Sequence, residues 1–166
     1  ESATLQNLAV SFARAGKPIG AICHGVLVLA RSIDSKTGKS ILFGRKTTAL
    51  TWRLERSAAS LAQVSRFWDP RYYRTYSEQP GQPEGFMSVQ QEVTRALAQA
   101  SDFQDVPADD PLARLKNSGL TRDTERDLRA SWVVCDGNYV SARWPGDAHA
   151  FALRFADIIE TQYAAG

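Results

Sequence analysis

The fold of this chain is decided by the segment Ile19-Gly20-Ala21-Ile22-Cys23-His24-Gly25-Val26. Residues 19–22 form a short apolar run after Pro18, and this length and setting favour a buried strand. The mostly apolar residues 26–31 favour a helix directly afterwards. A strand, one reactive residue, a glycine and a helix are typical of a nucleophile elbow, whose tight turn lifts the reactive side chain above the sheet edge.

Cys23 is the candidate nucleophile of this turn, and His24 is the candidate base. The first N–H groups of the helix would stabilise a thiolate and a developing oxyanion. Sequence neighbours can pair where the turn is sharp, which gives a Cys–His couple in which His24 moves the proton. The alternative is a buried structural cysteine at the end of a strand.

Hydrophobic periodicity predicts further helices and strands outside this segment. We expect helices over residues 4–15, 52–66, 88–100 and 148–163, and strands over residues 40–43, 45–48, 131–135 and 139–142. Asp136-Gly137-Asn138 favours a hairpin between the last two strands. Asp147 is placed to cap the last helix. Strands that alternate with helices predict an α/β layer fold.

The composition indicates one ordinary globular domain and argues against several functional classes. The chain has 166 residues, a formal net charge of +2, two cysteines and two histidines. A nucleic-acid-binding protein usually shows a basic surplus, and a membrane span needs ~18–20 apolar residues in a row; the sequence has neither. With so few and such widely spaced cysteines and histidines, we expect no disulfide framework, no metal site and no cofactor.

Three segments of the sequence resemble the ThiJ/PfpI superfamily of class I glutamine-amidotransferase-like proteins, in the order expected for that family. Residues 17–25 resemble its nucleophile segment. Residues 44–48 resemble the strand after the elbow helix, and residues 136–147 resemble the closing hairpin and helix entry. The resemblance covers about residues 1–55 and 130–163, and the adjacent cysteine and histidine are similar to those of the protease-like branch. It implies that the backbone N–H groups of the elbow, those of His24 and Gly25, form part of the oxyanion hole.

The resemblance implies a flavodoxin-like three-layer α/β/α sandwich with a mostly parallel sheet, a nucleophile elbow and a helical insertion. Residues 1–166 would form the C-terminal portion of a single domain, and about 53–130 would be an insertion that serves as a lid or an oligomer interface. In the family, an N-terminal portion supplies an acidic residue beside the cysteine. We therefore expect that portion as a companion chain cleaved from the same precursor, and we expect a homo-oligomer.

Within the insertion, an aromatic and basic stretch is the candidate substrate pocket, with packing in the core or an interface as the alternative. It comprises Tyr72, Tyr73, Arg74 and Tyr76. The other polar candidates are interpreted as structural or surface groups. We expect an exposed His149, a buried thiol at Cys135, an Arg143 paired with a carboxylate, solvated carboxylates at Glu55 and Glu92, and a loop acid at Asp123.

These patterns together predict a cysteine-dependent hydrolase or lyase of the ThiJ/PfpI type. Its substrate would be a small carbonyl, amide or isonitrile-like compound, since glyoxalase, amidase, peptidase and hydratase chemistry all fit the family. The alternative is a non-enzymatic redox-sensing or chaperone-like stress protein, because an accessible cysteine of low pKa serves either purpose. The sequence shows no targeting segment and no disulfide set, so the expected location is the cytoplasm.

Overall fold

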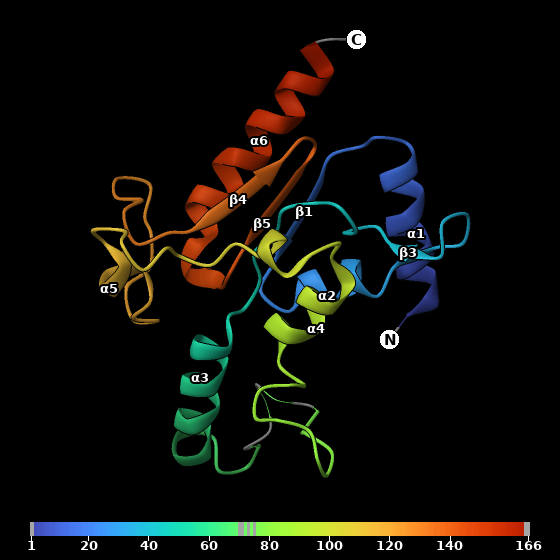
Figure 1. Ribbon diagram of the computed structural model, residues 1–166. Coiled ribbons are helices and arrows are strands. Elements are labelled where there is room, and N and C mark those ends of the chain that lie inside the picture. Colours follow the sequence, from blue (N-terminus) through green and yellow to red (C-terminus); the bar gives the residue numbers. More distant parts are fainter. Residues whose placement is uncertain (1, 70–71, 73, 75, 165–166) are drawn as a thin grey trace.

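A three-stranded sheet forms the centre of the fold in the computed structural model, which describes residues 2–69, 72, 74 and 76–164 (Figure 1). The strands are β1 (Ile19–Ile22), β5 (Tyr139–Ala142) and β4 (Val133–Asp136), in the order β1-β5-β4. β1 runs parallel to β5, whereas β4 and β5 are the antiparallel arms of the predicted hairpin. The sheet is therefore mixed, and a mostly parallel sheet is not shown.

Helices lie on both faces of this sheet. Gly20 faces α6 (Ala148–Ala164), whereas Ala21 belongs to a hydrophobic core that includes side chains of α2 (Gly25–Ala30) and α4 (Val89–Ala96). This arrangement confirms the mixed α/β class predicted from the alternation of strands and helices. No helix in the described ranges is both long and apolar enough to cross a lipid bilayer. The other elements are α1 (Ala3–Arg14), β2 (Ile33–Asp34), β3 (Lys39–Ser40), α3 (Trp52–Ser65), η1 (Ala100–Asp102), α5 (Ala113–Lys116) and η2 (Pro145–Asp147).

Gly20 is a point of close contact between β1 and α6. A Cβ atom at this position would lie 2.9 Å from Cζ of Phe151 and 3.2 Å from Cδ2 of Phe155. We expect Gly20→Val to lower the free energy of unfolding by about 1–3 kcal/mol, because the packed rings must shift. Urea denaturation measures this change. Gly25→Ala is the control, since its Cβ would meet no atom within 4 Å, and an equal loss in both variants would contradict this account.

The segment after β3 differs from the prediction. The sequence predicts two strands within residues 40–48, but β3 covers only the start of this range and turns follow it. Thr47 makes only an isolated β-bridge. Its hydroxyl lies 2.8 Å from the Tyr139 hydroxyl, and the Thr48 N–H donates to the Ser141 hydroxyl at 2.9 Å. Hydrogen bonds that involve side chains of β5 thus take the place of the backbone ladder that a strand would need.

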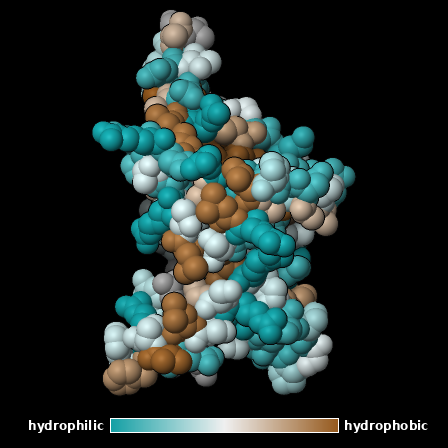
Figure 2. Space-filling model, turned by 90° about the vertical axis from the view of Figure 1, so that its left-hand side faces the viewer, coloured by the Kyte–Doolittle hydropathy of each residue, from teal (hydrophilic) through white to brown (hydrophobic). Residues whose placement is uncertain are grey.

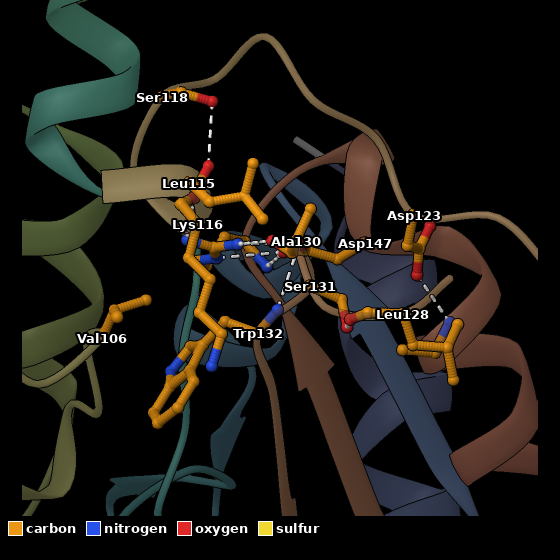
Figure 3. A network of polar contacts seen from close by, with 12 residues as sticks. Val106, Leu115, Lys116, Ser118, Asp123, Leu128, Ala130, Ser131, Trp132 and Asp147 are labelled. Carbon is orange, nitrogen blue, oxygen red and sulfur yellow. Dashed lines mark hydrogen bonds and ion pairs between the residues drawn. The ribbon is translucent and has the colours of Figure 1, made fainter. Parts of the chain in front are cut away.

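A buried ion pair joins the end of β5 to the start of α6, and Figure 3 shows its surroundings. Nη2 of Arg143 lies 2.8 Å from Oδ1 of Asp147, and both side chains are fully buried. The guanidinium also donates to the carbonyl oxygens of Lys116 and Ala130, at 2.7 and 3.2 Å. The predicted pairing of Arg143 with a carboxylate is confirmed. Its hydrogen bonds also hold the loop that follows α5 against the rest of the fold.

Asp123 satisfies the first N–H groups of α6, a role that the sequence assigns to Asp147. The Asp123 carboxylate accepts hydrogen bonds from the N–H groups of His149, at 3.1 Å, and Ala150, at 2.7 Å. Figure 3 shows Asp123 beside the start of this helix. Asp147 directly precedes α6, but its carboxylate binds Arg143 instead. The predicted cap is therefore wrong, because the acid that serves α6 comes from a distant loop.

Candidate functional site

Cys23 occupies a strained turn between β1 and α2. Its φ angle is 59°, in the left-handed region that residues other than glycine rarely adopt, and it is the one described non-glycine residue with a positive φ. Its N–H donates to the carbonyl oxygen of Ala142 at 3.0 Å, which holds the turn against β5. The strand, turn and helix predicted around Cys23 are therefore present. Backbone strain of this kind is concentrated at functional sites.

His24 lies beside the thiol. Its Nδ1 atom is 3.4 Å from Sγ of Cys23, within hydrogen-bonding distance for sulfur. The imidazole makes no capping bond to α2, although the residue stands at the start of that helix. The two neighbours thus pair as the sequence predicts, in a geometry that allows a proton to pass from the thiol to the imidazole.

Burial raises the pKa of the Cys23 thiol to about 11. The backbone N–H of His24 lowers this pKa, whereas the negative charges of Glu55 and Asp147 raise it further. The sequence argument predicts the opposite, a thiolate stabilised by the start of the helix. Because the thiol is protonated near neutral pH, Cys23 needs a base when it reacts, and His24 is the group in position.

A cavity of about 640 Å³ opens beside Cys23 and His24. Part of its wall is the face of α3 that carries Leu54, Ala58 and Leu61. Other parts come from the loop 118–122 and from the residues before α6. This volume and the mostly apolar lining suit a small organic molecule.

The four residues predicted to line a substrate pocket have different positions. Tyr72 lies in the cavity wall with Cys23. Arg74 and Tyr76 are not among the lining residues. Arg74 pairs with the carboxylates of Glu55, which is buried, and Glu78, which is half-buried. The Tyr76 ring packs against Arg31. The packing alternative therefore holds for these two. Tyr73 lies outside the described residues.

Glu55 is a buried carboxylate on α3, not the solvated one that the sequence predicts. It is only 2% exposed, it accepts a hydrogen bond from the Val89 N–H at 2.8 Å, and it lies 3.6 Å from Arg74. Burial raises its pKa to about 7, although the Val89 N–H and Arg74 lower it. Glu55 is buried because it joins α3, a wall of the cavity, to the first turn of α4.

We expect the stability of the protein to fall as the pH rises from about 4.5 to about 7, through Glu55. Its pKa is about 7 in the folded state against an ordinary value of 4.5, so the folded state binds more protons over this range and deprotonation favours unfolding. Urea unfolding across this range should show that Glu55→Gln removes the decline. Glu84→Gln is the control, since Glu84 is exposed. A decline of equal size in wild type and Glu55→Gln would exclude this role.

The remaining candidates lie away from the cavity. Cys135 is exposed, which corrects the prediction of a buried thiol: it lies on the edge strand β4, and α6 covers it only in part. His149 is exposed as predicted, and Glu92 pairs with Arg31 at 2.5 Å. In the described part of the chain, no group of three or more His, Cys, Asp and Glu side chains could hold a metal ion.

Most of the cavity lining was not identified from the sequence, and two of the missed residues, Arg122 and Trp144, can interact with a ligand through polar groups. The loop 118–122 contributes Arg122, and the residues before α6 contribute Trp144. The guanidinium carbon of Arg122 lies 5.7 Å from the centre of the Trp144 ring. No local motif marks Arg122, whereas Trp144 lies in the segment 136–147, where the sequence predicts a hairpin and the start of a helix.

Comparison with known proteins shows the fold alone. No family model matches the chain, and no curated protein matches it. The chain is similar to the Rapid Encystment Protein 24 KDa (REP24) of Francisella tularensis, with a TM-score of 0.61 and 18% identity, over 96% of this chain and 51% of that one. It is also similar to the protein APC35852, with a TM-score of 0.59 and 18% identity, over 98% and 53% of the two chains. The chain thus spans about half the length of these structures.

Proposed function

We propose that this chain carries the nucleophile of a cysteine-dependent enzyme of the ThiJ/PfpI type. The observation that carries the proposal is the position of Cys23, in a strained turn, 3.4 Å from Nδ1 of His24 and in the wall of a small-molecule cavity. The three segments that resemble the family support it. The substrate would be a small carbonyl, amide or isonitrile-like compound, which fits the mostly apolar lining.

The reaction would begin with loss of the thiol proton. Sγ of Cys23 attacks the electrophilic carbon of the substrate while its proton passes to Nδ1 of His24. A carbon–sulfur bond forms, and the π electron pair of a carbonyl group moves to its oxygen, where the N–H groups of His24 and Gly25 would stabilise it. With an amide, the oxyanion re-forms the carbonyl group, the carbon–nitrogen bond breaks, and the leaving amine takes the electron pair of that bond and the proton from His24. Water then hydrolyses the resulting thioester and releases the Cys23 thiol.

A companion segment would complete the site along the free edge of β1. In the described residues β1 pairs only with β5, and an open groove of about 480 Å³ follows its other edge. Leu5, Leu8 and Phe12 of α1 line this groove with apolar side chains that are each more than a third exposed. A strand from the N-terminal portion of the same precursor would pair there, extend the sheet towards a flavodoxin-like sandwich and bring an acidic residue to His24.

Product formation from three substrate classes tests the proposed activity. The purified protein is incubated with methylglyoxal, with a short-chain amide and with cyclohexyl isocyanide, and lactate, ammonia and the substituted formamide are measured. Formation of one of these products above the rate in buffer supports the proposal. If a folded sample that contains the companion segment forms none of them, the proposal fails. The contact between Cys23 and His24 favours the enzyme over the alternative of a redox sensor, because a sensor needs no group that moves a proton.

A further inference from the structure

We infer that the cavity beside Cys23 selects organic anions, and that the substrate class is a carboxylate joined to an apolar body. This inference rests on the proposed role of Cys23 as the nucleophile. The described side chains that line the cavity include two arginines, Arg66 and Arg122, and neither aspartate nor glutamate. A cleft lined by charge of one sign concentrates ligands of the opposite sign.

Arg122 belongs to the part of the cavity that contains the elbow. Its guanidinium lies over the ring of Trp144, which packs against the same hydrophobic core as Cys23. Trp144 also follows two residues after Ala142, whose carbonyl oxygen accepts the N–H of Cys23. A carboxylate held by Arg122 would therefore lie close to the carbon that the thiol attacks.

The positive charge of Arg122 has no ion-pair partner among the described carboxylates. The neighbouring acid, Asp123, is engaged elsewhere, since it accepts the first N–H groups of α6. The Asp123 N–H donates to the carbonyl oxygen of Gly146 at 2.7 Å, which fixes the backbone beside Arg122. The cation is thus held in place by the fold without being neutralised by it.

The indole N–H of Trp144 is a second group near Arg122 that could bind a ligand oxygen. The indole N–H of Trp144 is buried and has no hydrogen-bond partner among the described residues. A buried donor without an acceptor costs free energy, and a ligand oxygen that accepted from it would recover this cost. A carboxylate can interact with a guanidinium and accept from an indole N–H at the same time.

The apolar body of the ligand would lie along α3. This helix has 14 residues and is therefore ~21 Å long, and its Leu54, Ala58 and Leu61 line the cavity. Leu61 and, in the loop 118–122, Leu120 are both strongly exposed. Figure 2 shows hydrophobic side chains along the height of this face of the molecule, with one group at its lower left. Arg66 follows the end of α3, 3.8 Å from the Tyr72 ring centre, and adds a second cation there.

Alkylation by an anionic and a neutral reagent of similar size tests the charge preference. With iodoacetate or iodoacetamide, Sγ forms a bond to carbon, the carbon–iodine bond breaks, iodide leaves with the electron pair, and the thiol proton is lost. Exposed Cys135 is the reference within the same molecule. We expect the ratio of the iodoacetate rate to the iodoacetamide rate to be roughly fivefold higher at Cys23 than at Cys135, measured by peptide mass spectrometry.

Substitution of Arg122 tests whether this residue causes the preference for the anionic reagent. Arg122→Gln should lower the ratio at Cys23 to about the ratio at Cys135, and the ratio cancels any change in thiol reactivity because such a change affects both reagents alike. Arg53→Gln is the matched control, since Arg53 is exposed on α3 and does not line the cavity. Equal ratios at the two cysteines of the unaltered protein, or an unchanged ratio in folded Arg122→Gln, would overturn the inference.

Protection by a ligand separates this inference from the proposed activity. We expect 4-phenylbutyrate to slow the alkylation of Cys23 by iodoacetamide more than equimolar 4-phenylbutyramide does, and Arg122→Gln to remove the difference. Equal protection by the two compounds would count against an anion site. Neither compound needs to be turned over, so a preference for anions without any product formation would refute the enzyme but not the site.

Discussion

Cys23→Ser is expected to reduce product formation by roughly 10³-fold or more, to the rate without protein. A serine hydroxyl is a much poorer nucleophile than a thiol, and the site has no second group in the same position. Steady-state turnover of the substrate that the wild-type protein converts measures the effect. Cys135→Ser is the matched control, since Cys135 is exposed and is not a lining residue of the cavity, and it should retain wild-type turnover.

His24→Asn distinguishes catalysis from a structural role at this site. We expect a loss of roughly 10²–10⁴-fold near neutral pH, the usual contribution of a general base. The remaining activity should rise with pH towards the pKa of the Cys23 thiol, about 11, because the thiolate then forms without a base. Wild-type turnover in Cys23→Ser would refute the mechanism. A pH profile of His24→Asn that matches the wild type would remove His24 from it.

The elbow could be predicted from the sequence because its parts are neighbours. Four apolar residues, a cysteine, a histidine and a glycine specify the strand, the turn and the Cys–His contact over a single short segment. The protonation of Cys23 could not be predicted in this way. Its pKa depends on burial and on the charges of Glu55 and Asp147, which come from other elements.

Across the fold, features that depend on neighbouring residues were predicted, whereas features that depend on distant segments were not. β1, the hairpin of β4 and β5, and the long helices follow local periodicity. The acid that serves α6 and the position of Thr47 depend on contacts between distant segments, as do the burial of Glu55 and the place of Arg122 in the cavity. A helical pattern shows which side of α3 is apolar, but not that the N-terminus of α4 lies beside Glu55.

Asp147→Ala is expected to lower the free energy of unfolding by about 3–5 kcal/mol, because it leaves the charge of Arg143 buried without a counter-ion. Both side chains are fully buried, and the Asp147 carboxylate also accepts the backbone N–H groups of Arg143 and Trp132. Urea denaturation measures the loss. The exposed pair of Glu125 and Arg126 provides the control, and Glu125→Ala should change stability very little.

The double variant Arg143→Met with Asp147→Leu shows whether the pair acts as a unit. We expect its loss of stability to be smaller than the sum of the two single losses, because neither charge then remains buried alone. The guanidinium also holds the carbonyl oxygen of Lys116, at the start of the loop that carries Arg122. If the network positions that loop, the double variant should also lose anion selectivity at Cys23 while it remains folded. Additive losses would instead mean that the two side chains stabilise the fold independently.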